Sequence, residues 1–212
     1  MTRFHGYFRS SAAYRCRIAF NLKGLSYEFV PTPLREGAHR TEAFRALNPQ
    51  ALVPAIEQDG EVFTQSLAII EWLDETHPAP PLLPSDPAER AHARAFAQVI
   101  ACEIHPLQNL RVLDYLRRDL GQDEDGVSRW LTHWIGEGLA ACEGLLSRRP
   151  ESRFSFGDTP GLADICLVPQ MFSADRFGID TTAFPRLRAV RTACEALPAF
   201  AEAAPGRQPD AA

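Results

Sequence analysis

The chain has 212 residues, of which 45% are hydrophobic and 23% charged, a balance typical of a folded protein with one large or two small domains. Its net charge of −5 argues against nucleic acid as the main partner, and no apolar run reaches the ~20 residues needed to cross a bilayer. Five cysteines stand at wide intervals without Cys/His ligand spacing, which favours a cytoplasmic location and supports neither a zinc site nor a disulfide framework.

The first 80 residues are predicted to alternate strands and helices. A short strand over Arg3–Tyr7 leads into a helix over Ser11–Lys23, which Gly24 ends. The further elements expected here are a strand at Tyr27–Val30, a short helix at Thr41–Leu47, a hairpin of Val53–Glu57 and Glu61–Thr64 around Asp59-Gly60, and a helix at Ser66–Glu75. Together they form a βαβ unit, a connecting helix and a ββα unit, hence a small α/β domain over residues 1–80.

A proline-rich stretch then separates two regions of different character. Five prolines fall within residues 77–87, which excludes a helix or a central strand, and we place an interdomain linker at 81–87. Because strand signals almost vanish beyond it, residues 88–212 are expected to form an all-helical domain. Its helices are predicted at Ala88–Leu120 with a bend at Pro106, at Gly126–Ser147, at Gly161–Phe172 and at Pro185–Leu197, followed by an extended tail from Ala203.

The start of the first helix is the most informative chemical feature. Ser10 and Ser11 stand where the helix begins, and serine there caps free backbone N–H groups. The helix dipole favours negative charge at this end, and Arg9 precedes the two hydroxyls, so the site could hold an anion such as a thiolate. An ordinary serine cap is the alternative. Cys16, further along the helix, is expected to be a buried structural thiol.

Two dipeptides further along the chain can also be interpreted either as ligand-binding or as purely structural features. Pro54 opens a predicted strand, where a cis peptide bond can turn the backbone of Val53 toward a peptide-like ligand. Gln65-Ser66 opens the next helix, and Ser66 could cap it while the free N–H groups accept a carboxylate. A turn proline and a plain helix cap are the structural alternatives.

Taken together, these motifs resemble the glutathione transferase family. In that family Val-Pro binds the cysteinyl backbone of glutathione, Gln-Ser binds its γ-glutamyl group, and the start of the first helix activates the thiol. Phe156–Asp164 resembles the family's helix-capping segment, with Gly161 where Ser or Thr is usual. The resemblance implies a thioredoxin-like domain followed by an all-α domain, glutathione as cofactor, and a homodimer in which the small domain of one subunit meets the helical domain of the other.

The opening run Arg9–Gly24 resembles the zeta class of this family in particular. Zeta-class proteins are glutathione-dependent cis–trans isomerases. The implied reaction is conversion of maleylacetoacetate to fumarylacetoacetate, in tyrosine and phenylalanine catabolism, by thiolate addition, rotation and elimination. Because Ala12 stands where the class often has Cys, a protein thiol is dispensable here. Further matches are Asn48–Gln50, Ile104–Pro106 with Asn109 and Arg111, Asp175–Phe177 and Arg207–Asp210.

The resemblance also implies roles for individual residues. Ser10 is the preferred donor to the thiolate, with Ser11 close behind. Arg9 and Arg176 would bind the carboxylates and the developing enolate of the diketo acid, and their aromatic neighbours suggest partial burial, whereas Arg15 and Arg17 are expected to be structural or on the outer helix face. The expected glutathione contacts are Ser10, Ser11, His39, Val53, Pro54, Gln65, Ser66, His105, Asn109 and Arg111, with Arg111 also a candidate for substrate carboxylate and His105 equally able to be a core histidine.

Three other functions remain open at this point. A maleylpyruvate isomerase of gentisate degradation would use the same route on a shorter diketo acid. A zeta-class transferase acting on α-halo acids would use the same thiolate to displace a halide. A non-enzymatic interaction module of this fold is disfavoured, because it has no need for paired serines at the helix start.

Overall fold

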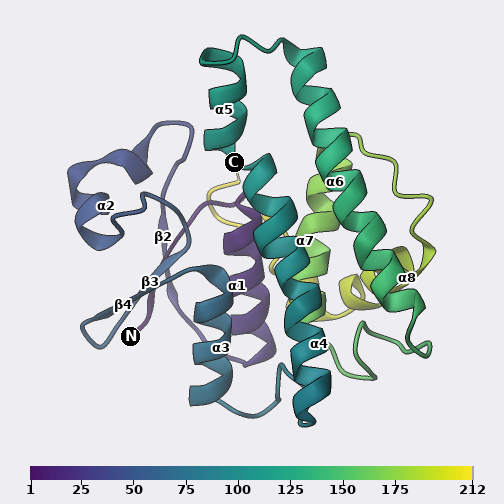
Figure 1. The fold of residues 1–212 in the computed structure, drawn as a ribbon. Helices are drawn as coiled ribbons and strands as arrows, with labels where there is room; N and C mark the ends of the chain where they lie inside the picture. The colour runs from purple at the N-terminus through teal and green to yellow at the C-terminus, as the bar shows by residue number, and fades with distance from the viewer. Residues whose placement is uncertain (212) are drawn as a thin grey trace. The chain divides into compact units, whose positions relative to one another are not determined.

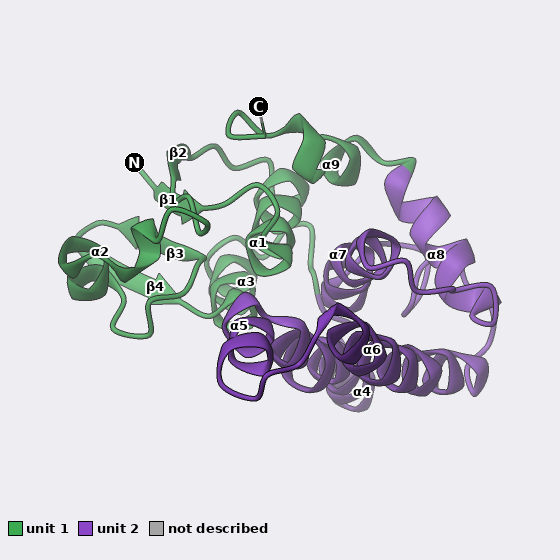
Figure 2. Cartoon of the chain, turned by 90° about the horizontal axis from the view of Figure 1, so that it is seen from above, with its two compact units in different colours: residues 1–82, 196–212 green, residues 83–195 purple. Residues whose placement is uncertain are grey.

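The computed structural model describes residues 1–211, and the chain divides into two compact units (Figure 2). The first unit contains Met1–Leu82 together with the residues from Ala196 onward, and the second contains Leu83–Glu195. No helix within the described part of the chain combines the length and apolar character needed to cross a membrane.

A four-stranded mixed sheet, in the order β2-β1-β3-β4, is the centre of the first unit. Strands β1 (Arg3–Gly6) and β2 (Glu28–Pro31) run parallel, and helix α1 (Ser11–Leu22) makes the crossover that parallel strands require. Strand β3 (Ala55–Gln58) is antiparallel to both β1 and β4 (Glu61–Thr64). This is the predicted βαβ and ββα arrangement, so the expected thioredoxin-like fold is confirmed.

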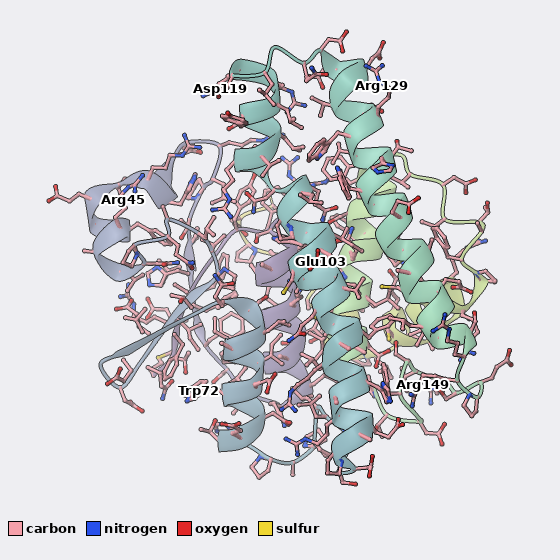
Figure 3. All side chains as sticks on the ribbon, viewed as in Figure 1. Arg45, Trp72, Glu103, Asp119, Arg129 and Arg149 are labelled. Atoms are coloured by element: carbon pink, nitrogen blue, oxygen red, sulfur yellow. The ribbon has the colours of Figure 1, made fainter. Side chains whose placement is uncertain are left out.

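Helices cover both faces of this sheet. Helices α1 and α3 (Ser66–Thr76) lie side by side on one face, whereas α2 (Glu42–Leu47), which follows the 3₁₀ turn η1 (Ala38–Arg40), lies on the other (Figure 1). Trp72 of α3, labelled in Figure 3, stacks on Phe63 of β4 with 4.4 Å between ring centroids. This stack joins α3 to β4, while the apolar residues that α3 buries are Ile69, Ile70 and Leu73.

The end of the chain packs on α1. The short helix α9 (Pro198–Ala201) contacts α1, and the 3₁₀ turn η4 (Pro205–Arg207) follows it, so the tail is partly helical where an extended segment was expected. The sequence places these residues in a helical domain running to 212, whereas the structure groups them with the first unit. With partners on several sides, every α1 residue from Ser11 to Phe20 is buried.

Across residues 83–195, all of them described, the named elements are helical. They are α4 (Pro87–Gln98), the π-helical segment η2 (Val99–Ile104), the 3₁₀ turn η3 (His105–Gln108), α5 (Leu110–Arg118), α6 (Glu124–Ser147), α7 (Leu162–Arg176) and α8 (Pro185–Glu195). The all-helical character expected for this part of the chain is therefore confirmed.

The prediction of one bent helix over Ala88–Leu120 is wrong. The α-helix ends at Gln98, a π-helical segment containing Glu103 follows (Figure 3), and a new α-helix begins only after Asn109, which caps it by accepting the Arg111 N–H at 3.2 Å. Pro106 lacks an N–H and crowds the preceding turn, so it interrupts the helix rather than bending it. Single π-helical turns of this kind are often found at functional sites.

Helix α7 begins after Gly161, as predicted, and Asp164 supplies the acceptors that the glycine lacks. The Asp164 carboxylate accepts the N–H of Gly161 at 2.8 Å and that of Ser155 at 2.9 Å, and its side chain is only 1% exposed. Burial raises the pKa of Asp164 above its ordinary value, although the two N–H donors act in the opposite direction. The loop before α7 and the first turn of α7 are thus joined through one carboxylate.

The contact between α6 and η2 predicts an effect on stability. A Cβ added at Gly138 would lie 2.2 Å from Cγ1 of the buried Ile104, whereas one at Gly144 would meet nothing within 4 Å. We expect Gly138→Ala to lower the free energy of unfolding by about 1–3 kcal/mol through overpacking. Gly144→Ala, in the same helix, should raise it by about 0.5–1 kcal/mol because alanine is the better helix former. Urea unfolding measures both, and a stabilising Gly138→Ala would contradict the close packing.

Candidate active site

Ser10 is the N-cap of α1. Its N–H donates to the Tyr7 carbonyl at 3.0 Å, which closes a turn, and its Oγ accepts the Ala13 N–H at 3.2 Å. Because the Oγ acts as acceptor toward the helix, its own O–H can still donate to an anion. The first turn of α1 contains no acidic side chain, so the positive end of the helix dipole is not neutralised from within the helix.

Two further groups adjoin this cap, as the sequence predicted. Ser11 is the first helical residue and is buried. Arg9 is half-buried, with its Cζ 5.0 Å from the centre of the Phe8 ring and its Nε buried without a hydrogen-bond partner. The turn therefore brings two hydroxyls and one guanidinium to the start of α1.

The loop before β3 has the expected cis peptide bond between Val53 and Pro54. Asn48, which is almost fully buried, holds the loop: its Nδ2 donates to the Leu52 carbonyl at 2.7 Å and its Oδ1 accepts the Gln50 N–H at 3.1 Å. Sequence reasoning finds only a class match at Asn48 and misses this structural role. Asn48 thus fixes the backbone that leads into the Val-Pro pair.

The prediction that Ser66 caps α3 is wrong. Gln65 is the N-cap, with a left-handed φ of 68° and no side-chain cap bond, and Ser66 is the first helical residue. Gln65 Nε2 instead donates to Oε1 of Gln50 at 2.8 Å. A non-glycine residue in this backbone region is strained, and such strain concentrates at functional sites. The start of α3 is therefore left without a side-chain acceptor and is suited to an anion.

Arg15 takes the first of the two positions that the sequence left open for it, structural or on the outer helix face. It is 1% exposed, which excludes the outer face, and its Nη1 donates to Ser66 Oγ at 3.3 Å. Its Nε and Nη2 are buried with no hydrogen-bond partner, which is costly for a charged group. Arg15 lies four residues after Ser11, hence on the same helix face, and this spacing is the signal that could have found it. The arrangement fits a carboxylate at the start of α3.

Two other predicted side chains near α1 and α2, those of Cys16 and His39, are also buried. Cys16 is buried as predicted, and its Sγ donates to the Ser66 carbonyl at 3.8 Å. His39 is buried in η1, where its Nε2 accepts from Arg40 Nε at 3.2 Å. Burial first, and then Arg40 and Arg45, lower the pKa of His39, so it is neutral at physiological pH. Within residues 1–211, no three His, Cys, Asp or Glu side chains are grouped to hold a metal ion.

The remaining predicted residues lie in the second unit. His105 opens η3, Asn109 uses its Oδ1 to cap α5, and Arg111 is exposed in the first turn of that helix. Arg176 ends α7 with its Cζ 4.3 Å from the centre of the Phe177 ring. It is exposed, so the partial burial expected from its aromatic neighbour is wrong: the ring lies against the guanidinium without covering it.

Comparison with known proteins gives consistent matches over the whole chain. Residues 4–81 match the family model for the glutathione S-transferase N-terminal domain, and residues 124–193 match that for the C-terminal domain. The chain is 49% identical to the maleylpyruvate isomerase of a Ralstonia species, over 99% of this chain and 100% of the relative. It is also 49% identical to the maleylacetoacetate isomerase of Pseudomonas aeruginosa, over 98% of each.

Solved structures are also similar to this chain over almost its full length. One is a holo structure of a maleylpyruvate isomerase, described as a bacterial zeta-class glutathione S-transferase, with a TM-score of 0.97, 49% identity, and coverage of 99% of this chain and 100% of that one. Another is a maleylacetoacetate isomerase from Methylobacterium extorquens with malonate and glutathione bound, with a TM-score of 0.96, 42% identity and 99% of each chain covered.

Proposed function

This chain belongs to the glutathione S-transferase family, and from that premise we propose that it is a glutathione-dependent isomerase that converts maleylacetoacetate to fumarylacetoacetate. The observation that carries the proposal is the pair of helix starts in the first unit. One presents Ser10 and Ser11 on a helix with no acidic first turn, and the other presents Ser66 over a buried, incompletely paired Arg15. The first suits a sulfur anion and the second a carboxylate.

The residues of the first unit fit glutathione. The start of α3, with Ser66 and Arg15, would hold the γ-glutamyl carboxylate, and the backbone of Val53 would hold the cysteinyl group. Bound glutathione supplies a thiolate whose addition turns the cis double bond into a single bond that can rotate. Ser10 would donate its O–H to the sulfur, and this bond together with the dipole of α1 lowers the thiol pKa.

Two arginines would bind the substrate. Arg9 and Arg176 carry permanent positive charge on planar donors that match carboxylates, and the same charge stabilises the enolate that forms on addition. Arg111, His105 and His39 stay predicted contacts by resemblance. Asn109 Oδ1 already accepts the Arg111 N–H in the α5 cap, so its Nδ2 is the group left to contact a ligand, as a donor.

A second substrate is supported equally well by similarity. Maleylpyruvate is the substrate named for a relative as similar as the maleylacetoacetate isomerase, and isomerisation of this shorter acid needs the same groups. Absorbance assays with both acids, with and without glutathione, test the proposal. We expect turnover only with glutathione, and the higher kcat/KM identifies the substrate. No turnover of either acid would refute it, and halide release from an α-halo acid would then favour the transferase alternative.

The homodimer and the cytoplasmic location stay predictions. The dimer follows from the family resemblance, and light scattering after size-exclusion chromatography measures it. The fractionation of cells that express the native gene measures the location.

Arg15 gives a prediction about binding. Arg15→Met removes a charged donor from the proposed carboxylate site, and such bonds contribute about 1.5–3 kcal/mol, so the Kd for glutathione should rise about 10–100-fold. Without ligand the variant should be no less stable, because an incompletely paired buried charge is replaced by an apolar side chain. Calorimetric titration and thermal unfolding measure the two effects.

Cysteinylglycine is the matched ligand control, because it lacks the γ-glutamyl carboxylate. Wild type and Arg15→Met should bind it equally weakly. An unchanged Kd for glutathione, or an equal loss for both ligands, would show that Arg15 does not act on that carboxylate.

A further inference from the structure

The turn that leads into α1 is fixed by residues from far along the chain. The Phe8 N–H donates to Oδ2 of Asp210 at 2.9 Å, although the two residues are 202 positions apart. The Phe8 carbonyl accepts from Nη2 of Arg17 at 3.0 Å. Both backbone polar groups of Phe8 are therefore held by charged side chains, in the same turn that the Ser10 N–H closes onto the Tyr7 carbonyl.

Arg17 connects this turn to the tail. Its Nε donates to the Ala203 carbonyl at 2.9 Å, and the side chain is fully buried. Burial lowers the pKa of Arg17 to about 10, while Asp210 is among the groups that raise it, so the guanidinium is charged at neutral pH. Oδ1 of Asp210 is itself buried and without a hydrogen-bond partner. The Asp210 carboxylate is thus directed into the protein rather than into solvent.

The tail has separate anchors on α1. Asn21 Nδ2 donates to the Ala199 carbonyl at 3.0 Å, and α9, which contains Ala199, contacts α1 (Figure 2). Gln208 Nε2 donates to the carbonyls of Glu202 and Ala204 at 2.9 and 3.0 Å, which shapes the tail internally. These bonds hold the tail in place without contacting the Tyr7–Ser10 turn. The bond from Phe8 to Asp210 is therefore not needed to hold the tail, and it fixes the turn.

We infer that Asp210 is a positioning residue, which together with Arg17 fixes the Tyr7–Ser10 turn and through it the placement of Arg9 and the Ser10 hydroxyl. Bonds between a backbone N–H and a carboxylate are stronger than neutral ones, so this contact is suited to hold a short turn rigid. The identity of the anion that these groups face rests on the proposed function. The inference that the tail fixes the turn does not depend on that function.

The first test uses the protein without ligand. We expect Asp210→Ala to speed hydrogen exchange of the Phe8 amide by about tenfold or more, since a charged hydrogen bond of about 1.5–3 kcal/mol is lost. Asn21→Ala, which removes a tail anchor away from the turn, should leave the Phe8 amide unchanged. Unchanged exchange in Asp210→Ala, or equal acceleration in Asn21→Ala, would overturn the inference.

The second test uses bound glutathione. In Asp210→Ala the thiol pKa, followed by thiolate absorbance, should rise. Because a misplacement of active groups by about 1 Å can cost about 100-fold in rate, kcat/KM should fall by about 10–100-fold. The Kd for glutathione should change little, because the start of α3 is untouched. Asp210→Asn keeps an oxygen for Phe8 and should lie between wild type and Asp210→Ala.

The two proposals fail in different ways. If wild type shows neither a lowered thiol pKa nor isomerase activity, the proposed function fails, while the exchange result still decides whether the tail fixes the turn. If wild type is active and Asp210→Ala keeps its thiol pKa and kcat/KM, the positioning role of Asp210 is overturned.

Discussion

Replacing Ser10 with alanine is expected to lower kcat/KM for glutathione-dependent isomerisation by about 10²–10³-fold, the scale measured for one lost donor that stabilises charge. The Ser10 Oγ caps α1 through the Ala13 N–H, and its O–H is the group proposed to donate to the sulfur. Without it the thiol pKa of bound glutathione should return toward its free value of about 8.5. Thiolate absorbance against pH and steady-state rates with either diketo acid measure the two effects.

A matched variant separates the cap from the chemistry. Ser10→Ala also removes the cap, worth about 1 kcal/mol of stability, whereas glycine is tolerated there at a cost of only a few tenths. Ser10→Gly should therefore lose as much activity as Ser10→Ala while unfolding close to the wild-type temperature. Wild-type rates in both variants would transfer the donor role to Ser11, the buried residue that follows.

Features set by neighbours in the sequence could be predicted. Asp59-Gly60 specifies the hairpin turn, in which both residues have positive φ, and Gly161 marks the start of α7. Ser10 and Arg9 adjoin each other in one turn, so their proximity needs no tertiary information. The exact end of the helix before Pro106 does not follow from local sequence, because η2 packs against α6 at Gly138, more than thirty residues away.

Features that depend on distant segments could not be predicted. Arg15 is buried because Ser66, 51 positions away, meets it between α1 and α3. Two arginines in the middle of a helix indicate that one helix face is exposed. That interpretation changes only when the distant segments that cover the face are known, and for α1 one of these segments is the tail. Local sequence favours Ser66 as the cap of α3, because serine is the better cap residue. The left-handed backbone of Gln65 overrides that preference.

The largest expected effect on stability is at Asp164. Its carboxylate accepts two backbone N–H groups, from Ser155 and Gly161, in a buried site. Asp164→Ala leaves both donors unsatisfied at about 1–3 kcal/mol each, and Gly161 has no side chain to replace them. We expect a loss of about 3–5 kcal/mol in the free energy of unfolding, which for a chain of this size lowers the Tm by about 10 °C.

Asp158, in the same loop, is the matched control because it is exposed. Asp158→Ala should change stability by less than about 0.5 kcal/mol, as is usual for surface positions. Asp164→Asn keeps one oxygen acceptor but turns an N–H₂ toward the second backbone donor, so it should lose about half as much as Asp164→Ala. Calorimetry ranks the four proteins directly. Because each step of this order follows from the number of N–H groups left unpaired, an Asp164→Ala variant as stable as Asp158→Ala would show that α7 needs no carboxylate at its start.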